Sequence, residues 1–350
     1  MKTSFVSNLA VQNAMRLTIQ QGQEELLKLQ TEVSTGRHAD VGLELGSSTA
    51  RSVNLQRELA RLETLVDTNS VVTQRLASSQ EALGSMAEAA EQVRNTLVTF
   101  KGNDSVDQLS VQKTEIESAM SLFTASANTS FNGEFLFAGI NTDVKPFEDY
   151  AATGSAAKAT FDNALSTYMS ANGIASMSDF TEAQMEDFIT NTLEPLYTDD
   201  TQWATDWSAA SSQNMTSRIS TSEVVQSSTN ATTSGFRMFA LASVISSELM
   251  DKDIRSDVRA YVGEAALGYV ERAVTGLTAE RSTLGISEAR VEKANTSIEV
   301  QIKLINTHIT DLEGVDTYDA STRMNTLLTQ METSYTLTGR IQQLSLIDFL

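Results

Sequence analysis

The stretch VERAVTGLTAERSTLGISEARVEKANTSIEVQIKLINTHITDLE, residues 270–313, decides the fold of this chain. Large apolar residues recur in it at every seventh position without a gap: Val270, Leu277, Leu284, Val291, Ile298, Ile305 and Leu312. A strict seven-residue repeat keeps one narrow seam against a partner helix and winds the two helices into a left-handed supercoil. Gly314 ends the pattern. We therefore predict a long helix from about residue 256 to residue 313 that packs along a second helix.

The N-terminal half supplies a matching helix, which we expect from about residue 48 to residue 101. Its residues at alternating third and fourth positions are Leu62, Leu65, Asn69, Val72, Leu76, Ser79, Leu83, Met86, Ala90, Val93, Leu97 and Phe100. Apart from Asn69 and Ser79 these are apolar, which is the pattern of a coiled-coil seam. The residues that we predict to carry the seam of the bundle are Leu62, Leu76, Leu83, Leu97, Leu277, Leu284, Val291 and Ile298.

Composition excludes several classes of protein. The chain has 350 residues, 45 acidic and 25 basic side chains for a net charge of −20, and no Cys. Disulfide and thiolate chemistry are therefore impossible, and the negative balance argues against nucleic acid or an anionic membrane as partner. No apolar run approaches the roughly 18 to 20 residues that span a bilayer, so we expect no membrane insertion. The first residues lack the apolar core of a Sec signal peptide.

The helix breakers divide the chain. Both prolines, Pro146 and Pro195, lie in its middle, together with Trp203 and Trp207. Residues 147–228 hold twelve Asp and Glu against Lys158 and Arg218, a net charge of −10. We therefore predict three parts: terminal helices in 1–45 and 315–350, a long-helix bundle in 46–145 and 229–314, and an acidic insert in 146–228. The insert could hold helices near 162–170 and 182–191, short strands near 217–226, and the two tryptophans in its core.

The sequence at each chain end predicts an amphipathic helix. Each of these helices has more apolar surface than one end segment can bury alone. Isolated helices are weakly stable in water, so we expect these ends to fray in the monomer and to fold against partners. The candidates for contacts between subunits are Leu26, Leu29, Val33, Met331, Ile341, Leu344 and Leu346.

The sequence offers little for chemistry. Its two histidines, His38 in a predicted loop and His308 on a helix, cannot be paired as metal ligands by their spacing, and no phosphate-binding glycine motif occurs. The acidic pairs lack the alternating ligand spacing of a calcium loop. We predict no catalytic, cofactor or metal site and no cofactor, hence a protein that is not an enzyme. An enzyme lodged in the insert and a cytosolic coiled-coil binding module remain as alternatives.

Four stretches carry a resemblance to a known family. Residues 29–37, LQTEVSTGR, are similar to the end of the first helix in bacterial flagellins and flagellar hook-associated proteins. Residues 131–139, FNGEFLFAG, resemble the family's short β-hairpin region, and residues 284–290, LGISEAR, resemble a stretch of its long C-terminal helix. Residues 342–350, QQLSLIDFL, look like the tail of its junction members. The likeness covers both arms and leaves the insert unmatched.

The resemblance implies a mainly α, elongated rod of long coiled-coil-like helices from both chain ends, with a short β-hairpin region and an inserted central α or α+β domain. It further implies a structural adaptor at the hook–filament junction, with the filament subunit itself as the alternative. The implied partners are further copies of the chain, hook-associated protein 1, flagellin and an export chaperone. Export would use the flagellar type III apparatus without a cleaved signal, and assembly would take place outside the cell.

Overall fold

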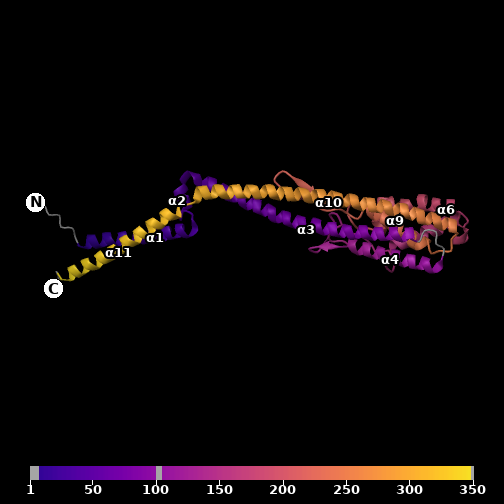
Figure 1. Ribbon diagram of the computed structural model, residues 1–350, viewed down its shortest axis with the longest axis horizontal. Helices are drawn as coiled ribbons and strands as arrows, with labels where there is room; N and C mark the ends of the chain where they lie inside the picture. The colour runs from indigo at the N-terminus through magenta and orange to yellow at the C-terminus, as the bar shows by residue number, and fades with distance from the viewer. Residues whose placement is uncertain (1–7, 100–104, 348–350) are drawn as a thin grey trace. The chain divides into compact units, whose positions relative to one another are not determined.

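The computed structural model describes residues 8–99 and 105–347, with the side chains of residues 8, 9, 12 and 341–347 left out of the description. The chain separates into two compact units, Met1–Thr64 with Ser297–Leu350, called unit 1, and Leu65–Thr296, called unit 2. Long helices dominate both units, and the strands of the described part form two small antiparallel hairpins (Figure 1). The predicted mainly α class with short hairpins is confirmed.

Unit 1 contains the helices of both chain ends and one end of each long helix. Its elements are α1 (Asn8–Thr35), α2 (Val41–Leu45), the 3-10 turn η1 (Gly46–Ser48), the start of α3 (Thr49–Thr99), the end of α10 (Ser256–Glu313) and α11 (Thr317–Ile347). The helix that we predicted from residue 256 to residue 313 has these bounds in the structure. The end that we predicted for the first long helix, Lys101, lies outside the described residues.

Unit 2 holds the rest of α3 and α10 and everything between them. Its helices are α4 (Val106–Ala127), α5 (Ala156–Ala171), η2 (Met177–Asp179), α6 (Glu182–Asp187), the π-helical turn η3 (Phe188–Leu193), α7 (Glu194–Thr198), α8 (Asp200–Asp206) and α9 (Ser234–Leu249). Its strands are β1 (Ser130–Phe131), β2 (Glu134–Phe135), β3 (Thr216–Arg218) and β4 (Val224–Gln226). The helices and strands suggested for the insert coincide with α5, α6, η3 and the β3–β4 hairpin.

The predicted seam residues on α3 and α10 are all buried: Leu62, Leu76, Leu83, Leu97, Leu277, Leu284, Val291 and Ile298. Asn69, the polar exception, is also fully buried. Its Nδ2 donates to the Ile219 carbonyl at 2.9 Å and to Asn295 Oδ1 at 2.7 Å. A buried amide that needs a specific partner favours one register of two helices over its neighbours. Asn69 and Asn295 therefore fix the alignment of α3 with α10 in unit 2.

The first hairpin follows from its turn residues. Asn132 and Gly133 have φ angles of 52° and 84°, which is the left-handed pair that a two-residue type I′ turn requires. Phe131 pairs with Glu134 across the turn. The hairpin is anchored to α3 by the buried Arg75, whose Nη1 lies 2.6 Å from Glu134 Oε2.

The core of unit 2 surrounds α9, whose sixteen residues are nearly all buried. Most of these buried residues are apolar, and the polar ones among them are Arg237, Ser243, Ser246 and Ser247. Phe239 on α9 stacks on Phe123 of α4 with ring centroids 3.8 Å apart, and Phe236 meets the same ring edge-on. Trp203 and Trp207, which are buried and stacked on each other, join this cluster through Phe147. The predicted place of both tryptophans in the core is confirmed.

One arginine connects the insert to α9. Arg237 is largely buried, and its Nη2 lies 2.5 Å from Asp200 Oδ1. Its Nη1 donates to the Thr198 carbonyl at 2.9 Å, and its guanidinium carbon lies 5.4 Å from the centre of the Trp203 ring. Charge-assisted hydrogen bonds and stacking on an indole use the planar shape that arginine has and lysine lacks. Arg237 thus fixes α7 and α8 against the bundle.

A tyrosine–carboxylate contact orders another part of the insert. Tyr168 donates from its hydroxyl to the Gln184 carbonyl and to Asp187 Oδ2, at 2.9 and 2.8 Å. Burial, together with the bond to Asp187, raises the pKa of Tyr168 to about 12. Hydrogen bonds from Asn191 and Tyr168 lower the pKa of Asp187, because they favour its charged form. This contact joins α5 to α6.

The two ends of the insert lie close together. Ala138 and Asn230 form an antiparallel β-bridge, and the Ala231 N–H donates to the Phe137 carbonyl at 2.8 Å. Within the insert, the Ser208 hydroxyl donates to the Pro146 carbonyl at 2.7 Å. The chain therefore leaves the bundle and returns to it at one place.

Helices α9 and α10 touch through their backbones. A Cβ atom at Gly276 would lie 2.7 Å from Gly235 Cα, and one at Gly235 would lie 2.8 Å from the Leu277 nitrogen. Real Cβ atoms do not approach other atoms so closely, so only glycine fits at either position. By contrast, a Cβ at Gly268 on the same helix α10 would meet nothing within 4 Å.

We predict that Gly276→Ala destabilises unit 2 by about 1–3 kcal/mol, because the methyl group forces the two backbones apart. The matched control Gly268→Ala should leave stability unchanged or raise it by up to about 1 kcal/mol, as expected for alanine in an open helical position. Urea unfolding followed by circular dichroism measures both changes. Equal stability of the two variants would show that α9 and α10 are not in backbone contact.

Candidate assembly interface

The candidate interface is the pair of helices α1 and α11 in unit 1, which run side by side (Figure 1). Met331 of α11 is buried with its side chain beside Gly22 of α1, and Leu29 of α1 is also buried. Polar contacts add to the pairing, since Gln23 Nε2 donates to the Tyr335 hydroxyl at 2.9 Å and the Thr338 hydroxyl lies 3.8 Å from Met15 Sδ. The pair joins residues more than 300 positions apart in the sequence.

Gly22 makes room for the Met331 side chain. A Cβ atom at Gly22 would lie 3.4 Å from Met331 Cγ, 3.5 Å from its sulfur and 3.9 Å from Leu327 Cδ1. These are ordinary van der Waals distances, so a methyl group would fit, whereas a larger side chain would displace Met331. Gly22, which interrupts the apolar pattern of α1, therefore lies beside Met331 of α11.

The structure divides the residues predicted for subunit contacts into three groups. Leu29 and Met331 are buried within the single chain, with 4% and 9% of their surface exposed. Leu26 and Val33 are half-buried. The side chains of Ile341, Leu344 and Leu346 lie outside the described residues. Met331 therefore packs on α1 inside one molecule, Leu29 is buried within the same chain, and a role of these positions between subunits stays a prediction.

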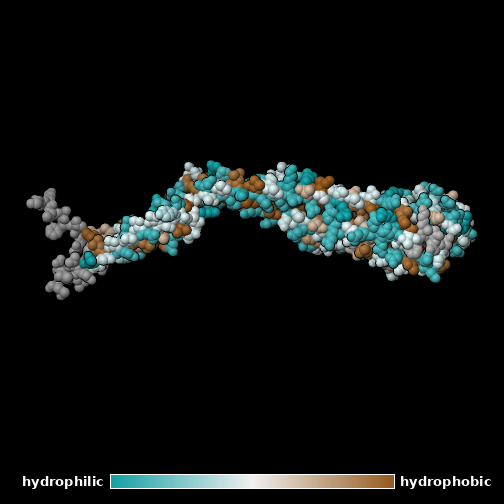
Figure 2. All heavy atoms as spheres, in the orientation of Figure 1, coloured by the Kyte–Doolittle hydropathy of each residue, from teal (hydrophilic) through white to brown (hydrophobic). Residues whose placement is uncertain are grey.

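Unit 1 exposes other large apolar residues, which are not among those that we predicted for contacts between subunits. On α1 and α11 they include Leu17, Leu27, Leu328, Tyr335 and Leu337, with exposed fractions of 57%, 63%, 39%, 47% and 49%. Figure 2 shows hydrophobic residues on the surface of this pair. The sequence already indicated this exposure through the adjacent pairs Leu26–Leu27 and Leu327–Leu328. Neighbouring leucines on a helix cannot both face the same partner, so one of each pair must point elsewhere. Exposed apolar surface of this kind marks interaction sites.

The turns at the roots of the two helices are joined by backbone hydrogen bonds. Gly36, with φ of 68°, ends α1 in the left-handed conformation that suits glycine. After it, the His38 N–H donates to the Glu313 carbonyl at 2.9 Å, and the Val315 N–H donates to the Gly36 carbonyl at 3.0 Å. Arg37 and Gly314 thereby form an antiparallel bridge. The STGR motif is thus paired with the end of α10.

The Glu313 side chain completes this junction. It is almost fully buried, with 1% of its surface exposed. Its Oε1 accepts hydrogen bonds from the Ser52 hydroxyl and, at 2.8 Å, from Gln56 Nε2, both on α3. Its Oε2 accepts from Arg37 Nη1 at 3.3 Å. We call residues 36–38, Ser52, Gln56 and residues 313–315 the Glu313 clasp. Glu313, Ser52 and Gln56 were not among the residues predicted from the sequence, whereas Arg37 is the last residue of the stretch 29–37 that carries the family resemblance.

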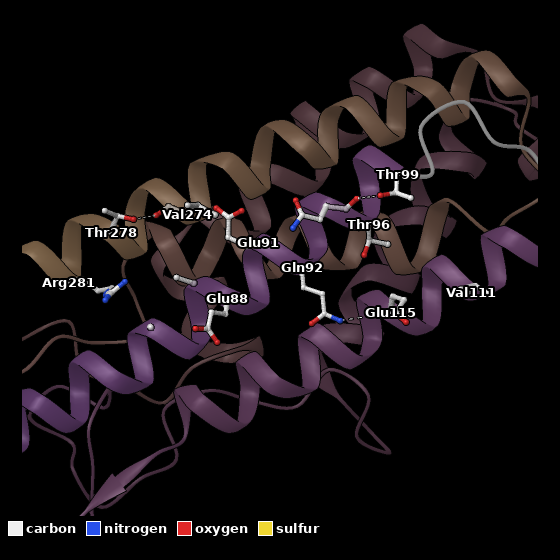
Figure 3. Close-up of a pocket in the computed structure, with 13 residues that line it drawn as sticks. Glu88, Glu91, Gln92, Thr96, Thr99, Val111, Glu115, Val274, Thr278 and Arg281 are labelled. Carbon is white, nitrogen blue, oxygen red and sulfur yellow. Dashed lines mark hydrogen bonds between the residues drawn. The ribbon is translucent and has the colours of Figure 1, made fainter.

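Unit 2 has a surface groove of about 830 Å³ over α3, between α4 and α10 (Figure 3). Its charged residues are Glu88, Glu91, Glu115 and Arg281, and Gln92 Nε2 donates to Glu115 Oε2 at 3.1 Å. The lining contains no histidine, serine or lysine, and the Thr99 and Thr278 hydroxyls in it donate to backbone carbonyls of their own helices. His38 lies at the root of α1, 3.6 Å from Glu32, and His308 is half-buried on α10.

In residues 8–99 and 105–347, no group of three or more His, Asp or Glu side chains is placed to hold a metal ion. Among the helices that the structure describes, none combines the length and apolarity needed to cross a membrane.

Comparisons with known proteins agree with this architecture. Residues 6–142 match the bacterial flagellin N-terminal helical region, and residues 267–350 match the bacterial flagellin C-terminal helical region. A solved structure of a protein from Vibrio parahaemolyticus, provisionally named as a flagellar hook-associated protein, is similar with a TM-score of 0.53. The two sequences are 12% identical, and the match covers 76% of this chain and 97% of that chain. No curated protein matches the chain.

Long helices joined along a heptad seam and chain ends that pair with each other define a helical structural subunit. The two matched regions cover well over half of the chain and include both of its ends. The chain belongs to the bacterial flagellin family. Proteins of this family are structural, in general not enzymes, and self-assemble into flagellar structures outside the cell.

We predict that Gly22→Ala stabilises the α1–α11 pair by up to about 1 kcal/mol, through helix propensity and the new contact with Met331. Gly339→Ala on α11 is the matched control, because a Cβ there meets nothing within 4 Å and gains propensity alone. Amide hydrogen exchange of α1 measures the difference. Faster exchange in Gly22→Ala than in the unmodified chain would contradict the described packing.

Proposed function

We propose that the chain is a structural adaptor subunit at the junction between the flagellar hook and filament, similar to hook-associated protein 3. The observation that carries this proposal is the α1–α11 pair, which brings both chain ends together and leaves large apolar residues uncovered, among them Leu17, Leu27 and Leu337. A subunit that assembles without covalent links needs such a surface at the part that meets its neighbours.

The three parts of the chain would have separate roles. The terminal helices, residues 1–45 and 315–350, would form the inner wall of a hollow tube through contacts between subunits. The long-helix bundle, residues 46–145 and 229–314, would form the next layer. The insert, residues 146–228, would face solvent, where its net charge of −10 over residues 147–228 limits lateral association through repulsion of like charges.

The adaptor role is favoured over that of the filament subunit by the two chain ends. The tail IDFL, residues 347–350, and the opening MKTSF, residues 1–5, resemble the junction protein more than the filament subunit. The fold neighbour is also named as hook-associated. Flagellin itself is the alternative, and a cytosolic coiled-coil interaction protein is the remaining one.

The adaptor proposal implies partners on both sides. Hook-associated protein 1 would lie on the hook side and flagellin on the filament side, with further copies of this chain around the tube. The chain would be exported through the flagellar type III apparatus without a cleaved signal, accompanied until export by a chaperone. We propose no nucleic-acid partner and no insertion into a membrane.

A bacterial strain in which the gene for this chain is deleted distinguishes the three candidate functions. For an adaptor, electron microscopy should show hooks without filaments, while flagellin accumulates in the medium because its subunits are exported and find nothing to assemble on. A filament subunit would leave hooks bare and the medium free of flagellin. Normal filaments in the deletion strain would overturn both flagellar roles and favour the cytosolic alternative.

The exposed leucines give a second prediction. Leu27→Gln combined with Leu337→Gln should abolish filament attachment in a complementation assay, since each leucine contributes roughly 1.5–3 kcal/mol when an interface buries it. The control is Val224→Gln, which changes an apolar side chain of similar exposure, 45%, on strand β4 of the insert. Both variants should be exported normally. Loss of filaments in the control, or their retention in the double variant, would place the assembly surface elsewhere.

A further inference from the structure

The groove over α3 in unit 2 has small residues in its lining. On α3 it extends from Gly84 to Thr99, a rise of about 22 Å at 1.5 Å per residue. A Cβ atom at Gly84 would meet nothing within 4 Å, so no contact with the described residues requires a glycine there. Glycine weakens a helix interior, and one reason for its presence is the close approach of another backbone. Gly84 and Ala87 thus leave room for a helix from outside the chain.

Two polar groups that line this groove have no partner among the described residues (Figure 3). Glu88 is exposed and unpaired there, whereas Glu91 and Glu115 accept hydrogen bonds or ion pairs from neighbouring side chains. The Thr96 hydroxyl has no hydrogen-bond partner in the described part of the chain, although this residue is only 8% exposed. The groove therefore fits a helix that brings small side chains and a basic group.

The start of α3 has such a face. Ala50, Val53, Arg57, Ala60 and Thr64 recur at alternating third and fourth positions, and all five are exposed in the single chain. This is the heptad spacing of a helix that packs along another helix, and none of the five side chains is large apart from arginine. The face is about 21 Å long, which matches the groove. Within the described residues, Arg57 has no carboxylate partner.

We propose that this face of residues 50–64 docks in the groove of a second copy of the chain. In a tube whose subunits all point the same way, the two α3 helices run parallel. Arg57 then lies beside Glu88 of the second copy, and Val53, one helical turn earlier, lies over Gly84. Both unpaired charges gain a partner, which matters because two chains of net charge −20 otherwise repel each other.

The contact joins two different surfaces of the same helix. Contacts of this head-to-tail kind continue from subunit to subunit and build rings or open helical assemblies, whereas a contact between identical surfaces stops at a pair. The inference rests on the self-assembly in the function proposed above and deepens it, because it places one subunit contact outside the terminal helices α1 and α11.

Disulfide trapping tests the contact, because the chain has no cysteine of its own. The purified, full-length chain with Val53→Cys and Gly84→Cys is concentrated with ammonium sulfate, which strengthens apolar association, and is then oxidised. Non-reducing gels should show a ladder of dimers, trimers and larger species. The matched control combines Val53→Cys with Gly268→Cys, an equally open position on α10, and should form the ladder at least tenfold more slowly.

Exchange of the two charges tests the pairing itself. Arg57→Glu or Glu88→Arg, added singly to the Val53→Cys and Gly84→Cys chain, should slow ladder formation at least tenfold, because each places like charges together. The two changes combined should restore the ladder, since they again provide opposite charges. Both residues are exposed, and circular dichroism checks that every variant keeps its helices.

Three outcomes would overturn the docking. The first is equal ladder formation in the two cysteine pairs, or no ladder in either. The second is trapping that stops at dimers. The third is a helical chain with both charges exchanged that forms no ladder. Trapping and gene deletion also fail separately. Bare hooks in the deletion strain without a ladder would leave the adaptor role and remove this contact, whereas a ladder with normal filaments would do the opposite.

Discussion

The heptad seam between α3 and α10 is the contact on which the other features of the bundle depend. Leu76, Leu83, Leu277 and Leu284 are completely buried along it, and the absence of proline from both helices lets it continue without interruption. Apolar seams alone tolerate sliding by one repeat, since leucine packs on leucine in any register. The Asn69–Asn295 pair removes that freedom in unit 2, and the Gly235–Gly276 contact then fixes α9 against the aligned helices. The leucines thus hold α3 and α10 together, whereas the asparagine pair sets their alignment.

Much of this fold could be predicted because its signals are local. The bounds of α10 follow from an unbroken repeat with a glycine after it, and the first hairpin follows from Asn132–Gly133, whose left-handed conformations few other residue pairs adopt. Helix α9 was not among the predicted helices, and its nearly complete burial depends on contacts with segments distant in the sequence, which a local pattern does not show. The π-helical turn after α6 likewise has no sequence pattern that distinguishes it from α-helix.

The candidate interface was predictable only in part. The apolar pattern placed Leu29 and Met331 correctly on helix faces, but a pattern cannot tell whether the partner face belongs to the same molecule or to another. In the structure Met331 packs beside Gly22 of α1 and Leu29 is buried within the single chain, while other leucines of the pair stay exposed. The Glu313 clasp could not be predicted from the sequence for a different reason. Arg37 and Glu313 are 276 positions apart, and either residue alone reads as an ordinary charge at the end of a helix.

The bridge between Ala138 and Asn230 has a consequence for how such chains can diversify. Because the bundle itself holds the two ends of the insert together, the segment between them forms a closed loop whose entropic cost grows only slowly with its length, by about 0.6 kcal/mol for each doubling. Longer, shorter or unrelated lobes can therefore be exchanged at this point if they supply their own core and cover the aromatic ring of Phe236. The bundle helices would keep the same alignment whichever lobe is joined to them at this point.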